Sequence, residues 1–205
     1  MNIWRHCLLS QRKFGGNPDD YFRIHKFIDS SKNFIFHVKH RILLHNLLGI
    51  ELCTDLLGDY VINSDGKVIL VRDIAAEHCK EDLSGFIPSL NDWFEDFNLP
   101  SDFLIPQIND EELKAFIYKP FMRSGLQTSM IITCSNFGVY LVEKFIGFDK
   151  ALLLANSLPI NQTIQNLLKE YKFIHNWQIF PDRKELVWLQ QNAENKQIQT
   201  KKTVD

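Results

Sequence analysis

Two histidine–aspartate pairs are the residues of this sequence best suited to chemistry. His25 and Asp29 are four positions apart, and so are His78 and Asp82. Within a helix, each pair would therefore lie on one face, one turn apart. Imidazole nitrogens and carboxylate oxygens together suit zinc, manganese or iron. The spacing makes both pairs candidate metal ligands.

Two histidines that lie between these pairs could complete a metal-binding set. The candidate ligands are His25, Asp29, His40, His45, His78 and Asp82. Open coordination positions would leave room to activate water, as in a metal-dependent hydrolase. Helical phosphohydrolases of the HD type use such ligands, but their adjacent His-Asp dipeptide is absent here.

Two other interpretations of the same polar residues stay open. In the first, the histidines are hydrogen-bonded to Asp29, Asp82, Glu77 and Glu81 and hold helices in register. The protein would then be a structural scaffold or a partner-binding module. In the second, a small anion or a nucleotide is bound by basic side chains. Those side chains are Lys32, Arg41 and Arg72. The residues alone do not decide whether the protein is an enzyme.

Three segments must position these side chains. Asn17 and Pro18 are typical of a helix start, and the helix that follows carries the first pair. Residues 31–57 are mostly apolar and predict one long helix, with polar groups gathered on one side. Those groups are His37, His40, Arg41 and His45. Residues 72–83 predict the helix that carries the second pair, so several helices must converge for a site to exist.

A β-hairpin is expected between the second and third of these helices. The stretch YVINSDGKVILV places two β-branched runs around Asn63-Ser64-Asp65-Gly66, which is typical of a tight turn. We therefore predict a mainly α (α+β) protein. Its N-terminal domain, residues 1–98, is a histidine-rich helical bundle with an inserted hairpin.

The second half of the chain is predicted to be a mostly helical region. Prolines at 100 and 106 suggest a boundary, and residues 99–192 follow it. We expect a strand at residues 129–134, a helix from residue 136 toward residue 154, and another at 183–191. Residues 193–205 read as a polar disordered tail. A protein partner could bind this region through Phe173, Trp177, Phe180 and Trp188.

The composition excludes several classes of protein. A net charge of −2 and a pI near 6.4 argue against a broad nucleic-acid-binding surface. The four cysteines are scattered without a CxxC pair, so we expect reduced thiols and a cytoplasmic protein rather than a disulfide framework. No apolar run reaches the length of a membrane span.

Four blocks of the first half, in this order, carry a resemblance to a known family. They are FGGNPDDYFRIHKFIDSSK, VKHRILLHNLLGIEL, INSDGKVILVRDIAAEHCKEDL and IPSLNDWF. The blocks resemble an uncharacterised family of small bacterial and phage proteins that is described as a domain of unknown function. The resemblance covers roughly residues 1–98 and implies a shared polar centre without an established activity. The residues it picks out are His6, His25, Asp29, Lys32, His40, Arg41, His45, Arg72, His78 and Asp82.

Overall fold

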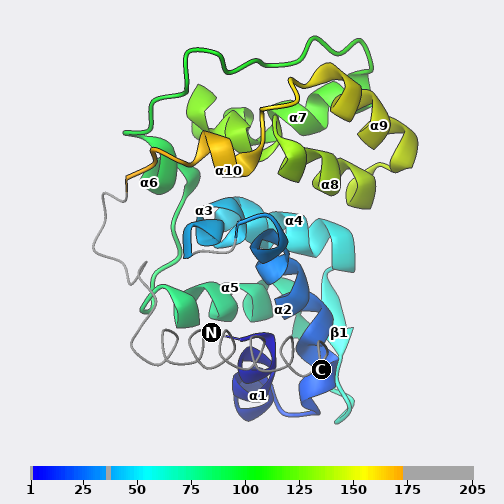
Figure 1. Cartoon of the computed structure of the whole chain (residues 1–205). Coiled ribbons are helices and arrows are strands. Elements are labelled where there is room, and N and C mark those ends of the chain that lie inside the picture. Colours follow the sequence, from blue (N-terminus) through cyan, green and yellow to red (C-terminus); the bar gives the residue numbers. More distant parts are fainter. Residues whose placement is uncertain (1, 36–37, 173–205) are drawn as a thin grey trace, which may run out of the picture.

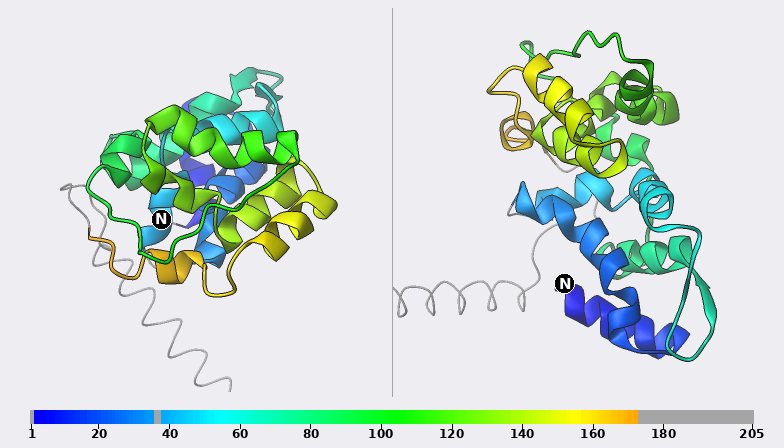
Figure 2. Two further views of the ribbon diagram at one scale, coloured as in Figure 1. Left: turned by 90° about the horizontal axis from the view of Figure 1, so that it is seen from above. Right: turned by 90° about the vertical axis from the view of Figure 1, so that its right-hand side faces the viewer.

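Two stacked layers of helices make up the protein. The computed structural model describes residues 2–35 and 38–172 (Figure 1). Helices α1 to α5 form one layer, and α6 to α10 form the other, which Figure 2 shows from two further sides. The prediction of a mainly helical chain with one hairpin is confirmed. No helix in the described part of the chain is long and apolar enough to cross a membrane.

The first layer contains five α-helices and the hairpin. Its α-helices are α1 (Ile3–Phe14), α2 (Phe22–Ile28), α3 (Arg41–Leu44), α4 (Leu47–Leu57) and α5 (Val71–Asp82). Single turns of 3₁₀ helix fill the connections, at Pro18–Tyr21, Asp29–Asn33 and Val38–His40. As expected, Asn17 precedes the first of these turns with a capping box, and Pro18 occupies its first position.

The hairpin joins α4 to α5. Its strands are β1 (Tyr60–Ile62) and β2 (Val68–Leu70), which pair antiparallel. Gly66 supplies the positive φ of the turn, at 76°, which glycine adopts without steric cost. The hairpin therefore returns the chain so that α5 can pack against α4 and α2.

The expectation of one long helix over residues 31–57 is wrong. After α3 the chain turns at His45, and Asn46 adopts an extended conformation that caps α4. The Asn46 side chain accepts a hydrogen bond from the Gly49 amide and donates one to the Ile42 carbonyl. Asparagine offers the backbone these alternatives to a continuous helix. The turn is tight, since a Cβ at Gly49 would lie 1.9 Å from the Leu44 carbonyl oxygen.

The second layer is also helical. It contains α6 (Leu90–Phe94), α7 (Glu111–Ser124), α8 (Asn136–Phe145), α9 (Phe148–Ser157) and α10 (Ile164–Leu167). The strand predicted at residues 129–134 is wrong, because this stretch belongs to a 3₁₀ helix, Gln127–Ile132, and the turn that follows it. Its apolar residues are buried on every side, so their pattern does not distinguish a strand from a helix. The helix expected from residue 136 toward 154 is interrupted at Gly147, whose φ is 128°.

The two layers share one large hydrophobic core. That core joins residues of α2, α4 and α5 to Ile131, Phe137 and Ile164 of the second layer. A smaller core lies within the second layer, around Leu113 and Leu154. The domain limits at residues 98 and 192 remain predictions. The helix expected at 183–191, the tail and the four aromatic residues proposed for a partner lie outside the described residues.

Candidate metal centre

A buried group of histidines and aspartates lies where α1, α2, the α3–α4 turn and α5 meet. Asp29 follows α2, and His45 occupies the turn between α3 and α4. His78 and Asp82 come from one face of α5. One ligand atom from each of these four residues lies within 4.8 Å of the other three. All four side chains are buried. We call this group the Asp29–Asp82 cluster.

Nitrogen and oxygen atoms converge at the centre of the Asp29–Asp82 cluster. The Nε2 atoms of His45 and His78 are 3.2 Å apart. Asp29 Oδ1 is 3.6 Å from His45 Nε2 and 3.4 Å from His78 Nε2. Asp82 Oδ2 lies 3.2 Å from His45 Nε2 and 4.0 Å from His78 Nε2. Two imidazole rings and two carboxylates therefore direct donor atoms into one small volume.

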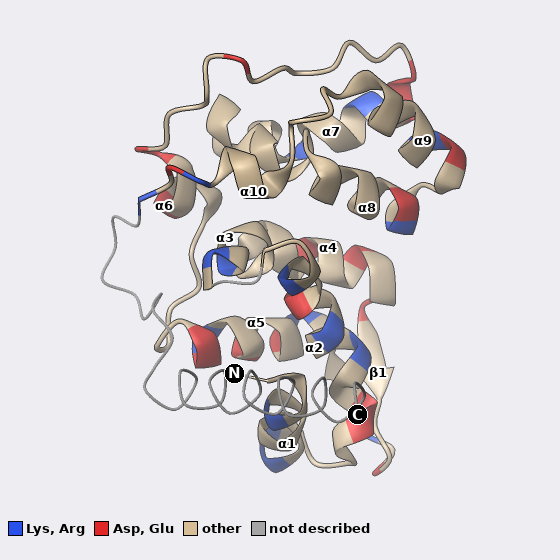
Figure 3. Ribbon diagram, viewed as in Figure 1, with Lys and Arg blue, Asp and Glu red and all other residues tan. Residues whose placement is uncertain are grey.

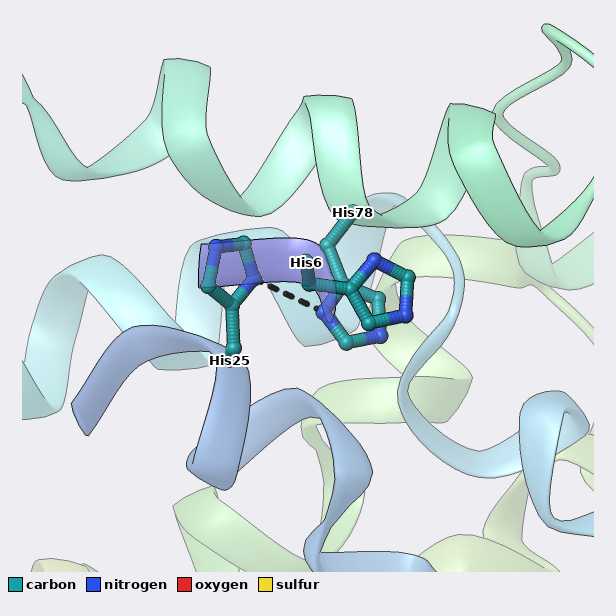
Figure 4. A group of neighbouring side chains, drawn as sticks. All are labelled: His6, His25 and His78. Carbon is teal, nitrogen blue, oxygen red and sulfur yellow. Dashed lines mark hydrogen bonds between the residues drawn. The ribbon is translucent and has the colours of Figure 1, made fainter. Parts of the chain in front are cut away.

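A chain of hydrogen bonds lies behind His78. His78 Nδ1 and His25 Nδ1 are 2.9 Å apart (Figure 4), and His25 Nε2 is 2.9 Å from Ser10 Oγ on α1. When His25 donates its Nε2 proton to Ser10, His25 Nδ1 can accept from His78 Nδ1. This tautomer leaves a lone pair on His78 Nε2, the atom that faces the cluster. His25 is therefore placed to orient His78 from outside the cluster.

His6 is a member of the centre that the metal hypothesis did not include. Its Nδ1 is 2.5 Å from Glu81 Oε2, and its Nε2 is 3.5 Å from Asp82 Oδ1. Its ring stacks on that of His78, with centroids 3.8 Å apart (Figure 4). The signal available in the sequence was modest: His6 faces inward on an amphipathic helix and appears in the family resemblance.

The other predicted ligand, His40, is adjacent to the cluster rather than part of it. His40 is buried, its Nδ1 is 3.1 Å from Ser31 Oγ, and its ring centroid is 5.0 Å from that of His45. His37, which was expected on the same side as His40, lies outside the described residues. The structure therefore brings four of the six predicted ligands into the cluster, with His25 behind His78 and His40 at the edge.

The three basic residues predicted to bind an anion are not gathered at one site. Lys32 Nζ is 2.6 Å from Asp29 Oδ2, and Arg41 Nε is 3.2 Å from Asp82 Oδ2. Lys32 contacts the Asp29 oxygen other than the one that faces the histidines, whereas Arg41 contacts the Asp82 oxygen that also lies near His45. Arg72 instead lies at the surface, where its side chain is 72% exposed and 3.8 Å from Asp73.

The electrostatics leave the cluster histidines neutral and its aspartates ionised. Burial lowers the pKa of His78, that of His45 to about 3 and that of His25 to about 2. Burial alone would raise the pKa of both aspartates. The neighbouring histidines and the charges of Lys32 and Arg41 outweigh it and hold each aspartate pKa well below its usual value. These protonation states are the ones in which imidazole and carboxylate bind metals.

His6 behaves differently from the other histidines. Burial opposes its charged form, but the carboxylates of Asp82 and Glu81 outweigh burial and raise its pKa. Charges of opposite sign also surround the centre. Figure 3 shows acidic positions along α5 and basic positions on α1 and α2. Lys13 of α1, for instance, pairs with Glu77 of α5 at 2.5 Å.

Several buried polar atoms of the centre have no hydrogen-bond partner among the described residues. They include Asp29 Oδ1, His6 Nε2 and His45 Nδ1. Buried polar atoms are normally satisfied, so unsatisfied ones require an explanation such as an ion. Asp29 Oδ1 and His6 Nε2 both face other donor atoms of the centre, which places the lack of partners where a cation would lie.

The comparisons with known proteins identify the family of the first half. No curated protein and no solved structure matches the chain. A family model described as "Domain of unknown function (DUF6915)" matches residues 1–103, which include every residue of the Asp29–Asp82 cluster as well as His6, His25 and Glu81. With half of its length matched by this model, the chain belongs to the DUF6915 family.

Proposed function

We propose that this domain is a scaffold closed by one divalent metal ion, held by Asp29, His45, His78 and Asp82. The ion would join α2, the α3–α4 turn and α5 at their common contact. Metal binding would then contribute directly to folding, because such a site is assembled only in the folded chain.

The spacing of the four ligand atoms carries this proposal. Ligands placed about 2.0–2.1 Å from a tetrahedral zinc ion are about 3.3 Å apart. Five of the six separations in the Asp29–Asp82 cluster run from 3.2 to 4.0 Å, which brackets that value. Ordinary hydrogen bonds would give shorter N–O distances of about 2.7–3.2 Å. Two of the separations, from His45 Nε2 to Asp82 Oδ2 and to His78 Nε2, lie at the upper end of this range and are hydrogen bonds. The other three are longer than hydrogen bonds, and all five suit ligands around a common ion.

One carboxylate oxygen without a hydrogen-bond partner also supports a cation. Two ionised carboxylates and two neutral imidazoles carry a charge of −2, which the side chains of Lys32 and Arg41 offset. Lys32 and Arg41 contact Oδ2 of Asp29 and of Asp82, respectively, whereas Asp29 Oδ1 has no hydrogen-bond partner. A buried carboxylate oxygen without a partner is costly. A divalent ion would remove this cost.

A structural role fits the centre better than hydrolysis. Catalytic zinc sites keep one coordination position for water or substrate, whereas structural sites are closed by four protein ligands. Here four side chains supply the ligands, and each is at most 5% exposed. The same burial disfavours anion binding, since Lys32 and Arg41 are already directed at carboxylates.

Metal analysis tests the proposal. The full chain, purified without chelator, should contain about one zinc, manganese or iron ion, and the metal-free protein should bind zinc in a calorimetric titration. His45→Gln should abolish tight binding. His40→Gln is the matched control, because His40 is equally buried and adjacent to His45 but outside the cluster. A wild-type protein that neither retains nor binds metal would disprove the proposal.

A further inference from the structure

The outward face of α1 is both apolar and basic. With a step of about 100° per residue around the helix, four exposed residues fall within an arc of about 100°, opposite the buried His6. They are Trp4, Arg5, Leu8 and Arg12, which we call the α1 patch. With Asn2 and Leu9 they line an open hollow of about 440 Å³. The helix itself lies at the edge of the first layer that is farthest from the second layer (Figure 1).

The α1 patch carries positive charge without a counter-charge. The side chains of Arg5 and Arg12 form no ion pair with a described residue, and α1 contains no acidic residue. Lys13, by contrast, pairs with Glu77 of α5. Arginine side chains beside exposed apolar ones suit an occupant that is acidic as well as apolar.

The patch is small, which limits what can occupy it. A nucleic acid is usually held through about 6–10 phosphate contacts, and an anionic membrane through about 4–8 clustered basic residues. Two arginines fall short of both. A stable complex with a separate protein buries about 800 Å² on each partner, more than four side chains on one helix offer. A tethered segment binds through less contact, because its effective concentration is high. These limits favour a segment of the same chain.

The chain beyond the described residues has a face of complementary chemistry. Residues 182–192 contain the helix predicted at 183–191, which lies outside the described residues. The same step of about 100° per residue gathers two acids and two leucines within an arc of about 100°. They are Asp182, Glu185, Leu186 and Leu189, whereas Arg183 and Lys184 fall outside this arc. The segment therefore has an acidic and apolar face as wide as the α1 patch.

The linker, residues 173–181, is long enough to bring this segment to α1. The described chain ends at the boundary between the layers, where Tyr171 packs in the shared core and Lys39 of the first layer donates to the Leu168 carbonyl. From there α1 lies about two helix-packing distances away, or roughly 20 Å, because it packs on the outer side of α2 and α5. A fully extended linker of this length reaches up to about 30 Å.

We propose that residues 182–192 dock on the α1 patch as an antiparallel helix. In one register, residues four apart coincide on the two helices. Glu185 then lies beside Arg12, and Leu189 lies beside Leu8. The docking goes beyond the metal centre and does not depend on it, since the patch faces away from the Asp29–Asp82 cluster.

Hydrogen exchange of the full chain, read by mass spectrometry in peptides that cover residues 183–191, tests this docking. A helix of this length is marginal by itself in water, so slow exchange there requires packing. We expect the segment to exchange at least about 10-fold more slowly in wild type than in a synthetic peptide of residues 173–205. Leu8→Ser should speed its exchange about 5-fold or more, and Arg12→Glu about 2- to 5-fold. Combining Arg12→Glu with Glu185→Arg should restore the protection.

Leu152→Ser is the matched control, because it removes an exposed leucine from α9 of the second layer. It should leave exchange of residues 183–191 unchanged. Wild-type exchange as fast as that of the peptide would overturn the proposal, and so would protection that survives both α1 substitutions. Protection that grows with protein concentration would assign the patch to a second copy of the chain and overturn docking within one chain. Should an α1 variant not fold, Glu185→Arg alone decides, since it alters neither layer and should speed exchange as Arg12→Glu does. Metal binding should be the same in all these variants, so failure of the docking leaves the metal centre standing.

Discussion

The two layers of this protein bury polar groups in opposite ways. In the first layer the buried polar residues include charged and titratable side chains, namely His6, His25, Asp29, His40, Arg41, His45, His78 and Asp82. Within the described residues 99–172, the buried polar residues are all uncharged, namely Ser129, Thr133, Ser135 and Gln162.

Most of the buried polar groups of the second layer are satisfied by the backbone. Gln162 Nε2 donates to the Leu104 and Cys134 carbonyls, and Gln162 Oε1 accepts from the Leu104 amide. The Thr133 hydroxyl donates to the Ile117 carbonyl, whereas Ser135 Oγ has no partner. These side chains stabilise connections between helices, as buried uncharged groups usually do.

The buried polar groups of the first layer are not satisfied in this way. Its titratable groups contact each other, and partners are missing where Asp29 Oδ1 and His6 Nε2 face the centre. Folding alone would be served as well by apolar residues, because buried ionic groups seldom add net stability. The difference supports the proposal that the first layer keeps its polar centre to bind an ion, whereas the buried polar groups of the second layer join its helices.

Acid should reveal the largest difference between the layers. Burial places the pKa values of His25 and His45 near 2 and 3, and that of His40 well below its ordinary value. The unfolded chain therefore binds more protons once the pH falls below about 6.5, and stability decreases in that direction. Each such histidine contributes about 1.4 kcal/mol per pH unit, so three contribute up to about 4 kcal/mol per unit.

Urea unfolding in chelator, between pH 7.5 and 5, measures this loss. His6 acts with the opposite sign, because the stability from its raised pKa is present at acid pH and disappears as the pH rises. The described second layer contains no histidine. Stability that does not change over this range would contradict the burial of neutral histidines in the first layer.

In the second layer, Gln162→Ala should have an intermediate effect that does not depend on metal. The substitution leaves the Leu104 amide and the Leu104 and Cys134 carbonyls without their side-chain partner. The expected loss is about 1–3 kcal/mol in the free energy of unfolding. Asn161→Ala, at an exposed neighbouring position, is the control. If the loss of stability appeared only with metal present, the stability of the second layer would depend on the metal centre of the first.

The ion pairs between the layers should contribute least. Lys119 Nζ of α7 is 2.7 Å from Asp55 Oδ2 and 3.3 Å from Glu51 Oε1 of α4, and all three side chains are partly exposed. Lys119→Met should lower stability by less than about 1 kcal/mol. Thermal unfolding at low and high salt checks this estimate. A larger loss would mean that charge, rather than the shared core, holds the layers together.

Local patterns predicted much of the fold, and the failures have identifiable causes. The hairpin and the helix of His78 follow from turn residues and spacing that act over a few positions. The break at His45 depends on the Asn46 side chain and on the close approach of Gly49 to Leu44. Residues 31–57 are so strongly apolar that their pattern predicted a continuous helix and indicated neither the cap nor the close approach. The apolar run at 130–132 is buried on all sides, so its sequence carries no periodicity to identify.

The candidate site was predictable in its ligand types but not in its inner arrangement. Spacing within one helix placed His78 and Asp82 together, and that contact is observed. Which side chains from other elements reach them depends on helix packing. His25 therefore faces His78 from behind, Arg41 pairs with Asp82, and His6 enters from α1.

Thermal unfolding of wild type and Asp29→Asn, each in chelator and in excess zinc, tests the metal centre most directly. Asp29 Oδ1 is the buried ligand atom without a hydrogen-bond partner. We predict that zinc at 1,000 times its Kd stabilises wild type by about 4 kcal/mol and stabilises Asp29→Asn little. In chelator, the variant should unfold near the wild-type temperature, because the change also relieves repulsion between carboxylates. The opposite pattern, wild type indifferent to zinc and Asp29→Asn weakened by about 3–5 kcal/mol in chelator, would contradict the metal centre and identify a purely structural network.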